Sequence, residues 1–173
     1  MTERVLDISD VGFWEGRQFR ISFELSIPTG TTQYIRFIAA ADFALLRQEL
    51  AVDANGVKFT ALRDATTGGV WTPITPRAKN IMSTTNPYTA KTVIESGTIA
   101  GGATVSGGVV TETIRVVASG ATAQAATVGA TAGDQRGLPA GTYLLAFQCL
   151  GNGTATGVYT LIFEERPSGV TKG

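Results

Sequence analysis

The sequence predicts an all-β protein, a single antiparallel β-sandwich with a jelly-roll-like arrangement of strands. Three segments indicate this, because their apolar residues occur at every second position and would share one face of a strand. They are Phe19, Ile21, Phe23, Leu25 and Ile27, then Tyr143, Leu145, Phe147 and Cys149, and finally Tyr159, Leu161 and Phe163. An antiparallel sheet with one apolar face needs a second apolar layer, which favours a sandwich.

The length and composition favour one globular domain. The chain has 173 residues, of which 43% are hydrophobic and 16% are charged, enough to build one core. We expect residues 19–173 to form the sandwich and residues 1–18 to form an N-terminal arm or a first strand. The N-terminal residues mix acidic and apolar side chains, so we expect no secretory signal and no membrane span.

The segments between residues 28 and 61 follow the pattern of an all-β protein. Residues 28–31, PTGT, predict the end of the first strand, and residues 33–39 predict the next one. Residues 42–55 fit both a helix that begins at Asp42 and a strand, and we favour the strand. The reason is the turn sequence DANG at residues 53–56, which leads directly into a further apolar alternation and predicts a hairpin.

The middle of the chain contains several signals that interrupt strands. Residues 66–69, TTGG, predict a second turn, and Pro73 and Pro76 exclude a central strand near them. Residues 86–88, NPY, predict a surface crossing, and residues 92–95 predict a short strand. Strands at such regular spacing are typical of a sandwich or a jelly roll.

The second half is poor in charge and rich in small residues. Between residues 97 and 163 the charged residues are Glu112, Arg115, Asp134 and Arg136. Residues 97–110 and 119–133 consist mainly of Gly, Ala, Thr and Val, which predicts thin sheet with mobile loops. The single cysteine, Cys149, is in register with Phe147, so we expect a buried apolar side chain in a protein folded in a reducing cytoplasm.

Composition argues against several functional classes. With 14 basic residues, 14 acidic residues and no histidine, the formal net charge is zero, so we expect no nucleic-acid or membrane partner. The lack of histidine excludes Ser-His-Asp and Cys-His catalysis and imidazole metal ligands. We therefore expect no catalytic residue, no metal site and no cofactor. Glu164 and Glu165 are adjacent and would lie on opposite faces of a strand, so they cannot together flank a glycosidic bond.

A glycosidase pair assembled in space stays open as an alternative. Its candidate carboxylates are Glu24, Asp42, Glu49 and Glu112.

The candidate interface residues are aromatic side chains and arginines. Phe13 and Trp14 near the N-terminus, and Trp71 and Tyr88 in the proline-rich middle, suit protein interfaces or sugar platforms. The alternative, that they cap the ends of the sandwich, stays open. Arg17 and Arg20 could pair with carboxylates of a neighbouring subunit reached by the N-terminal arm.

Four segments resemble small virion structural proteins of tailed bacteriophages. They are residues 16–28 (GRQFRISFELSIP), 118–128 (ASGATAQAATV), 136–145 (RGLPAGTYLL) and 151–165 (GNGTATGVYTLIFEE). The resemblance implies a non-catalytic protein of the phage particle, assembled in the host bacterial cytoplasm. It favours a capsid decoration or cement protein that binds the major capsid protein and copies of itself, as a dimer or trimer. The alternative is a receptor- or glycan-binding module of a tail or head fibre, with Trp71, Tyr88 and residues 151–157 as its contact surface.

Overall fold

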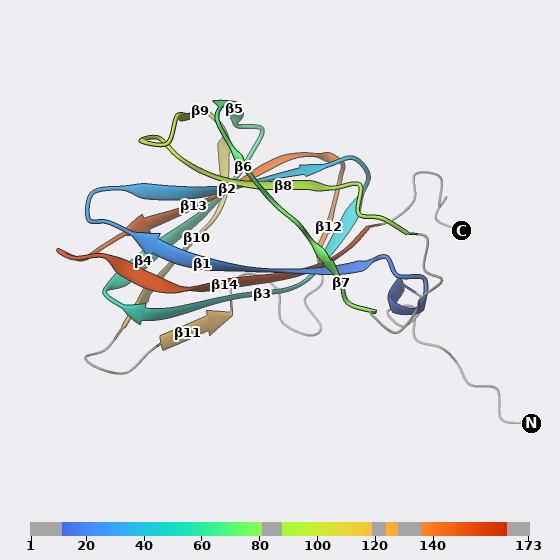
Figure 1. Ribbon diagram of the computed structural model, residues 1–173, viewed down its shortest axis with the longest axis horizontal. Helices are drawn as coiled ribbons and strands as arrows, with labels where there is room; N and C mark the ends of the chain where they lie inside the picture. Colours follow the sequence, from blue (N-terminus) through green and yellow to red (C-terminus); the bar gives the residue numbers. More distant parts are fainter. Residues whose placement is uncertain (1–11, 81–87, 119–123, 128–135, 166–173) are drawn as a thin grey trace, which may run out of the picture.

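The computed structural model describes residues 12–80, 88–118, 124–127 and 136–165. They form two six-stranded antiparallel sheets packed face to face and a separate two-stranded ribbon (Figure 1). Sheet A contains β1 (Gln18–Ile27), β3 (Phe43–Ala54), β7 (Arg77–Ala78), β11 (Gln124–Thr127), β12 (Arg136–Leu138) and β14 (Ala155–Glu165). Sheet B contains β2 (Thr32–Ala39), β4 (Gly56–Arg63), β6 (Thr72–Ile74), β8 (Val93–Thr98), β10 (Val109–Val117) and β13 (Gly141–Cys149).

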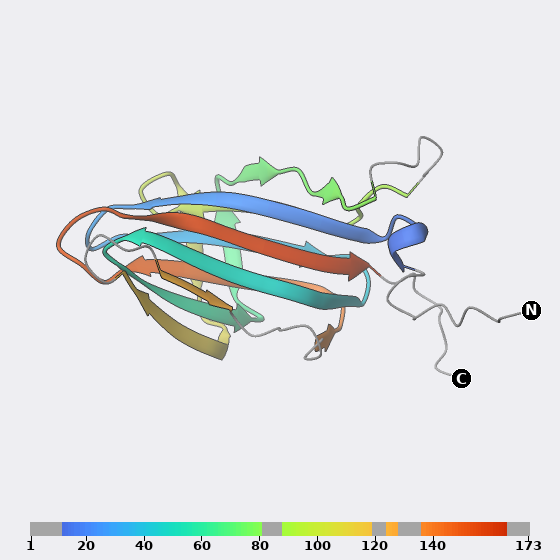
Figure 2. The same ribbon diagram turned by 90° about the horizontal axis from the view of Figure 1, so that it is seen from below.

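The order of the strands places the first and last strands, β1 and β14, side by side. In sheet A the order is β11, β3, β14, β1 and β7, with β12 also paired to β3. In sheet B it is β10, β4, β13, β2, β8 and β6. Figure 2 shows the long strands β1, β14 and β3 in front of sheet B. The predicted antiparallel sandwich is thus confirmed, while the jelly-roll order stays a prediction.

The core lies between the two sheets and is rich in aromatic rings. Phe59 and Phe147 of sheet B contact Tyr159 of sheet A, with ring centroids 6.0 and 5.0 Å from that of the tyrosine. Farther along, Phe37 of sheet B lies 5.0 Å from Phe163 of sheet A. The apolar residues at every second position of the strands in both sheets point into this layer, and these are the residues that are buried.

The ambiguous segment is strand β3, as predicted, but the predicted hairpin is wrong. β3 pairs with β14 in sheet A, whereas β4 pairs with β13 and β10 in sheet B, so the DANG sequence is a corner between the sheets. Asn55 adopts a positive φ of 59° there, and its carbonyl accepts the N–H of Ala118. Turn chemistry specifies the reversal of the chain but not the partner of each strand.

The predicted turn at residues 66–69 is also wrong, because these residues form strand β5 (Thr66–Gly69). It pairs with β9 (Ala103–Ser106) in a two-stranded ribbon that projects from sheet B at the top of Figure 1. A Cβ on Gly69 would lie 2.0 Å from the carbonyl oxygen of Gly102. The glycines that suggested a turn instead allow two backbones to approach closely.

The proline-containing segment forms short edge strands, in agreement with the prediction. Pro73 lies in the three-residue strand β6 at the edge of sheet B, and the two-residue strand β7 forms an edge of sheet A. Proline cannot donate to a ladder, so it is compatible with an edge and not with a central position. The strand predicted at residues 92–95 is β8.

The glycine-rich half forms sheet where the structure describes it. Residues 97–110 contribute to β8, β9 and β10, and of residues 119–133 only β11 falls within the described residues. Cys149 is buried, as predicted, with its sulfur 3.1 Å from the carbonyl oxygen of Gly153. In the described part of the chain no helix has the length and apolar character needed to cross a bilayer.

Candidate functional site

Strand β14 ends in two adjacent buried carboxylates. As strand alternation predicts, they have separate surroundings on the two faces of sheet A. Glu164 accepts hydrogen bonds from Arg17 Nη1 at 3.2 Å and from Gln18 Nε2 at 3.0 Å. Glu164 is 5% exposed and Glu165 is 2% exposed. Each carboxylate therefore depends on donors of the protein for the hydrogen bonds that water would otherwise supply.

Glu165 fastens a distant segment of the chain to the end of β14. Its carboxylate accepts the hydroxyl of Tyr88 at 2.9 Å and the backbone N–H groups of Lys91 and Thr92, the latter at 2.6 Å. Burial, followed by the hydrogen bond to Glu165, raises the pKa of Tyr88 to about 12. The carboxylate is saturated with donors, which suits a structural clamp.

Residues 12–18, the described part of the predicted arm, pack against the sandwich of the same chain, and Gln18 already belongs to β1. Residues 12–14 form one helical turn, and a Cβ on Gly12 would lie 2.2 Å from the carboxyl carbon of Glu164. Arg17 pairs with Glu15 at 2.6 Å and with Glu164. Arg17 is thus already paired within its own chain, and the predicted pairing with a carboxylate of a neighbouring subunit stays a prediction.

The two N-terminal aromatic side chains differ in exposure. The ring centroids of Phe13 and Trp14 lie 5.2 Å apart in an edge-to-face arrangement, and the ammonium group of Lys79 lies over Phe13. Trp14 is 65% exposed, whereas Phe13 is half-buried. Of this pair, Trp14 is the side chain with a free surface for a partner.

Trp71 has an internal role that the sequence did not reveal. Its indole N–H donates to the carbonyl of Gly68 at 2.8 Å, and the guanidinium carbon of Arg36 lies 4.5 Å from its ring centroid. Arg36 also pairs with Glu95 across β2 and β8, and donates to the hydroxyl of Thr67. These contacts fasten the β5–β9 ribbon to the outer face of sheet B.

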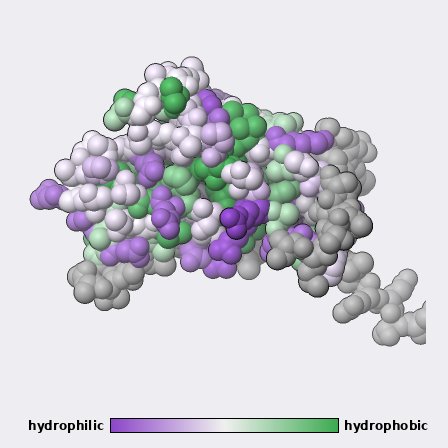
Figure 3. All heavy atoms as spheres, viewed as in Figure 1, coloured by the Kyte–Doolittle hydropathy of each residue, from purple (hydrophilic) through white to green (hydrophobic). Residues whose placement is uncertain are grey.

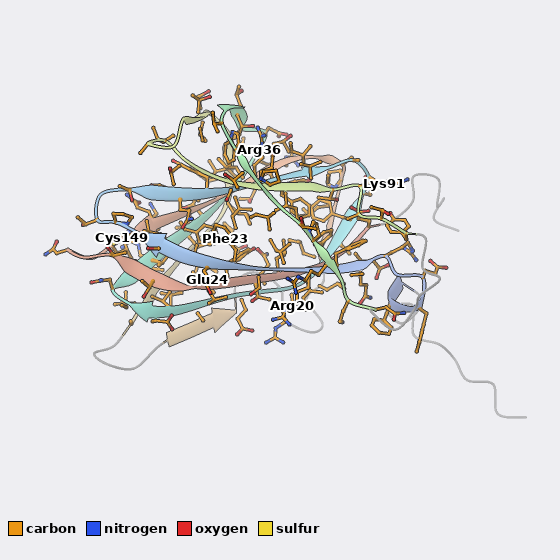
Figure 4. All side chains as sticks on the ribbon, in the orientation of Figure 1. Arg20, Phe23, Glu24, Arg36, Lys91 and Cys149 are labelled. Atoms are coloured by element: carbon orange, nitrogen blue, oxygen red, sulfur yellow. The ribbon has the colours of Figure 1, made fainter. Side chains whose placement is uncertain are left out.

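The predicted contact surface of Trp71, Tyr88 and residues 151–157 is not formed. Trp71 contacts Arg36, and Tyr88 lies near Lys91, two residues that Figure 4 shows well apart. The 151–157 loop lies at the end of the sandwich near Cys149, where Asn55 Nδ2 donates to the carbonyl of Thr154 at 2.8 Å. The three features therefore belong to different parts of the molecule.

Arg20 is exposed on the outer face of β1, where Figure 4 labels it near the part of the strand that pairs with β7. The residue directly opposite it in β7 is Arg77. This second arginine was missed in the sequence because it lies 57 positions away, in a strand of two residues.

A polar cavity lies on the inner face of sheet B next to β6. It has a volume of about 180 Å³ and is lined by Gln33, Val70, Thr72, Ser96, Gly97, Thr98 and Gly101. The amide oxygen of Gln33 is buried and has no hydrogen-bond partner among the described residues. The hydroxyl groups and this free acceptor suit a neutral hydroxylated ligand.

A second cavity, of about 130 Å³, lies between the sheets and has a mostly apolar wall. It is lined by Phe37, Phe43, Leu45, Gln48, Ala61, Leu62, Arg63, Thr111, Glu112, Leu138, Tyr143, Leu145 and Leu161.

On the surface, Figure 3 shows hydrophobic residues on the projecting β5–β9 ribbon. Next to its strands, Val70 is 67% exposed and Ile99 is 57% exposed.

The carboxylates considered for a glycosidase pair are dispersed. Glu24 and Glu49 lie on the outer face of sheet A, where Glu49 pairs with Arg47. Glu112 lines the cavity between the sheets, and Asp42 accepts the N–H of Ala140. Among the described residues, no group of three or more His, Cys, Asp and Glu side chains is arranged to hold a metal ion.

Known proteins offer no relative from which a function could be transferred. No protein-family model, curated protein or solved structure matches this chain.

Proposed function

We propose that this chain is a non-catalytic structural protein of a tailed bacteriophage particle, and that it acts as a capsid cement or decoration protein. In this role it binds the outer surface of the shell and bridges neighbouring capsomers. The resemblance of its first and last strands to small virion proteins supports the proposal that the chain is part of a phage particle. The observation that carries a binding role is the exposed apolar edge of sheet B.

That edge is strand β10, which has β4 as its neighbour in sheet B and no second neighbour among the described residues. Val109, Val110 and Val117 on it are 64%, 56% and 62% exposed. A Cβ on Gly56 would lie 3.4 Å from Val117 and 3.3 Å from Leu150, so these two exposed side chains are neighbours. An edge strand with apolar side chains offers both main-chain hydrogen bonds and apolar area to a partner.

The proposed partners are the major capsid protein and further copies of this chain. A standard interface buries roughly 800 Å² on each partner, which a domain of this size can provide. Closed oligomers multiply such contacts through avidity, so a dimer or trimer would hold the shell more firmly than a monomer. The mechanism is mechanical: added contacts between capsomers oppose the internal pressure of the packaged DNA.

Copy number and particle stability test this proposal. We expect quantitative gel staining of purified particles to show this chain in numbers within a small factor of the capsid protein. Particles that lack it should assemble and then rupture at a lower temperature than complete particles. A few copies per particle, or equal heat resistance of the two kinds of particle, would contradict the cement role.

A double substitution probes the apolar edge directly. Val110→Asp with Val117→Asp should reduce incorporation into particles, because charged groups would be buried at the interface. The matched control is Val93→Asp, which changes a 49% exposed valine of β8, four strands away in the same sheet. Equal incorporation of the double variant and the control would show that β10 is not the contact edge.

A glycan-binding module of a tail or head fibre is the second candidate. The buried, unpartnered amide oxygen of Gln33 in a hydroxyl-lined cavity favours it, because a sugar hydroxyl could donate to this oxygen. Binding to immobilised host polysaccharide that Gln33→Leu abolishes, together with a low copy number in the particle, would favour the fibre over the cement role.

A further inference from the structure

One edge of sheet A carries three outward-facing cations. In the β1–β7 pair, Arg77 lies directly opposite Arg20, and Ala78 lies opposite Phe19. Ala78 packs against the core, so Arg77 and Lys79 on either side of it point to the outer face, as Arg20 does. The protein has no formal net charge, yet this edge is locally basic.

Arg20 and Arg77 form no ion pair within the described residues. Both are exposed, and every ion pair in this part of the chain is made by other residues. Glu164 lies diagonal to Arg20 across the β1–β14 pair, but it is paired with Arg17 and Gln18. Glu24 lies four residues along β1 on the same face, a distance of about 13 Å at 3.3 Å per residue. Like charges directly opposite each other are unfavourable, so an anion from outside would relieve this pair.

A cavity of about 560 Å³ adjoins the two arginines. It is lined by Arg20, Ile21, Ser22, Ile74, Thr75 and Arg77, and we call it the arginine cavity. Its lining residues Ile74 and Thr75 belong to the segment that leaves β6 of sheet B and crosses to β7 of sheet A, as Figure 2 shows. Two guanidinium groups and two hydroxyls supply donors, while Ile21 and Ile74 supply apolar wall.

We propose that the arginine cavity binds a carboxylate side chain presented by an acidic segment of a partner protein. Guanidinium groups bind carboxylates in a bidentate manner, and the two hydroxyls can complete the hydrogen bonds of the oxygens. The isoleucines suit the methylene groups of a glutamate better than a hydrated phosphate. The choice of a protein as the source of the carboxylate rests on the proposed function.

Fluorescence anisotropy with a labelled hexaglutamate peptide tests the site without any phage particle. We expect the full chain to bind the peptide at low salt, and Arg20→Ala with Arg77→Ala to weaken binding at least tenfold. Arg20→Lys with Arg77→Lys should weaken it several-fold, because lysine keeps the charge but lacks the planar pair of donors. Neither variant should be less stable than the wild type in urea, because the two like charges repel each other and form no ion pair within the described residues.

The chain offers a matched control. Lys58 and Arg115 also lie opposite each other, on β4 and β10 of sheet B, but they line none of the three cavities described here. Lys58→Ala with Arg115→Ala removes the same charge and should leave peptide affinity within twofold. Equal losses from the two double variants would overturn the proposal, because binding would then follow net charge alone.

Competition distinguishes the source of the anion. Stronger binding of single-stranded DNA than of hexaglutamate, or displacement of the peptide by equimolar inorganic phosphate, would overturn a carboxylate site. These results are independent of particle copy number. Peptide binding together with a low copy number would support the carboxylate site and contradict the cement role. A high copy number without peptide binding would support the cement role and contradict the site.

Discussion

At the scale of single residues, the buried polar groups show where this fold is most sensitive. Glu165 accepts donors from Tyr88, Lys91 and Thr92, which lie more than 70 positions away in the chain. Inside the core, the hydroxyl of Tyr159 donates to Gln48 Oε1 at 2.7 Å. A buried hydrogen bond of this kind stabilises the folded protein only modestly. Removing one partner destabilises it by more, because no water replaces the lost hydrogen bond.

Glu165→Gln should destabilise the protein although it preserves the shape of the side chain. An amide NH₂ would face either the backbone N–H groups or the Tyr88 hydroxyl, so at least one buried donor loses its acceptor, at a cost of about 2 kcal/mol. Urea unfolding measures this difference. Glu24→Gln is the control on an exposed strand position, and equal stability of the two variants would refute the clamp role of Glu165.

Tyr88 predicts a pH dependence above neutrality. Its pKa is about 12 in the folded protein and near the ordinary value of 10 in the unfolded chain. As the pH rises above 10, the unfolded chain therefore loses this proton first, and the contribution of Tyr88 to stability falls until the pH passes 12. The free energy of unfolding should decline with pH, and burial of Tyr159 and Tyr143, which raises the pKa of each, adds to the decline.

Tyr88→Phe isolates the contribution of this residue. The stability difference between the wild-type protein and the variant should shrink as the pH is raised from 9 to 11.5, in a series of urea titrations. A difference that stays constant over this range would show that the Tyr88 hydroxyl does not lose its proton with the expected shift.

At the scale of elements, close backbone approach decides how the long strands pair. The register between β14 and β3 shifts at Gly157, where a Cβ would lie 2.2 Å from the carbonyl oxygen of Ala51. A bulge of this kind bends the strand and increases its twist, which helps β14 follow both β1 and β3. This glycine is therefore required by contact with a neighbouring backbone.

Gly157→Ala should destabilise the sandwich by roughly 1–3 kcal/mol, because the rigid backbone of β3 must move to accept the methyl group. Gly137→Ala in β12 is the matched control, since a Cβ there meets no atom within 4 Å. Chemical unfolding should find the control equal to or slightly more stable than the wild type, because alanine restricts the unfolded chain. A neutral Gly157→Ala would show that the bulge can relax freely.

At the scale of the whole molecule, one aromatic layer joins the two sheets. Phe59 has no exposed surface and contacts Phe147 within sheet B and Tyr159 in sheet A. Neither sheet has a second apolar layer in the described part of the chain, so each depends on the other for burial. The free energy that holds the sandwich together is therefore shared across both sheets.

Phe59→Ala should lower the free energy of unfolding by about 3–5 kcal/mol, through lost burial and the cavity left behind. Near- and far-ultraviolet circular dichroism should still report one coincident transition, because the sheets unfold together. Trp14→Ala, which removes a 65% exposed ring, should change stability by less than the core variant. Two separate transitions in Phe59→Ala would indicate that the sheets are independent.

The alternation of apolar residues in β1, β13 and β14 by itself determined the fold class and most of the core, because burial of one strand face is a local property. It also determined that Cys149 is buried and that the proline segment lies at edges. Only the tertiary structure decided which strands are neighbours. It placed β3 and β4 in different sheets, turned the TTGG glycines into a strand, and brought Arg77 opposite Arg20. Paired strands and candidate sites bring together residues that are far apart in the chain. Apolar alternation and turn sequences are local, so they do not specify which distant residues meet.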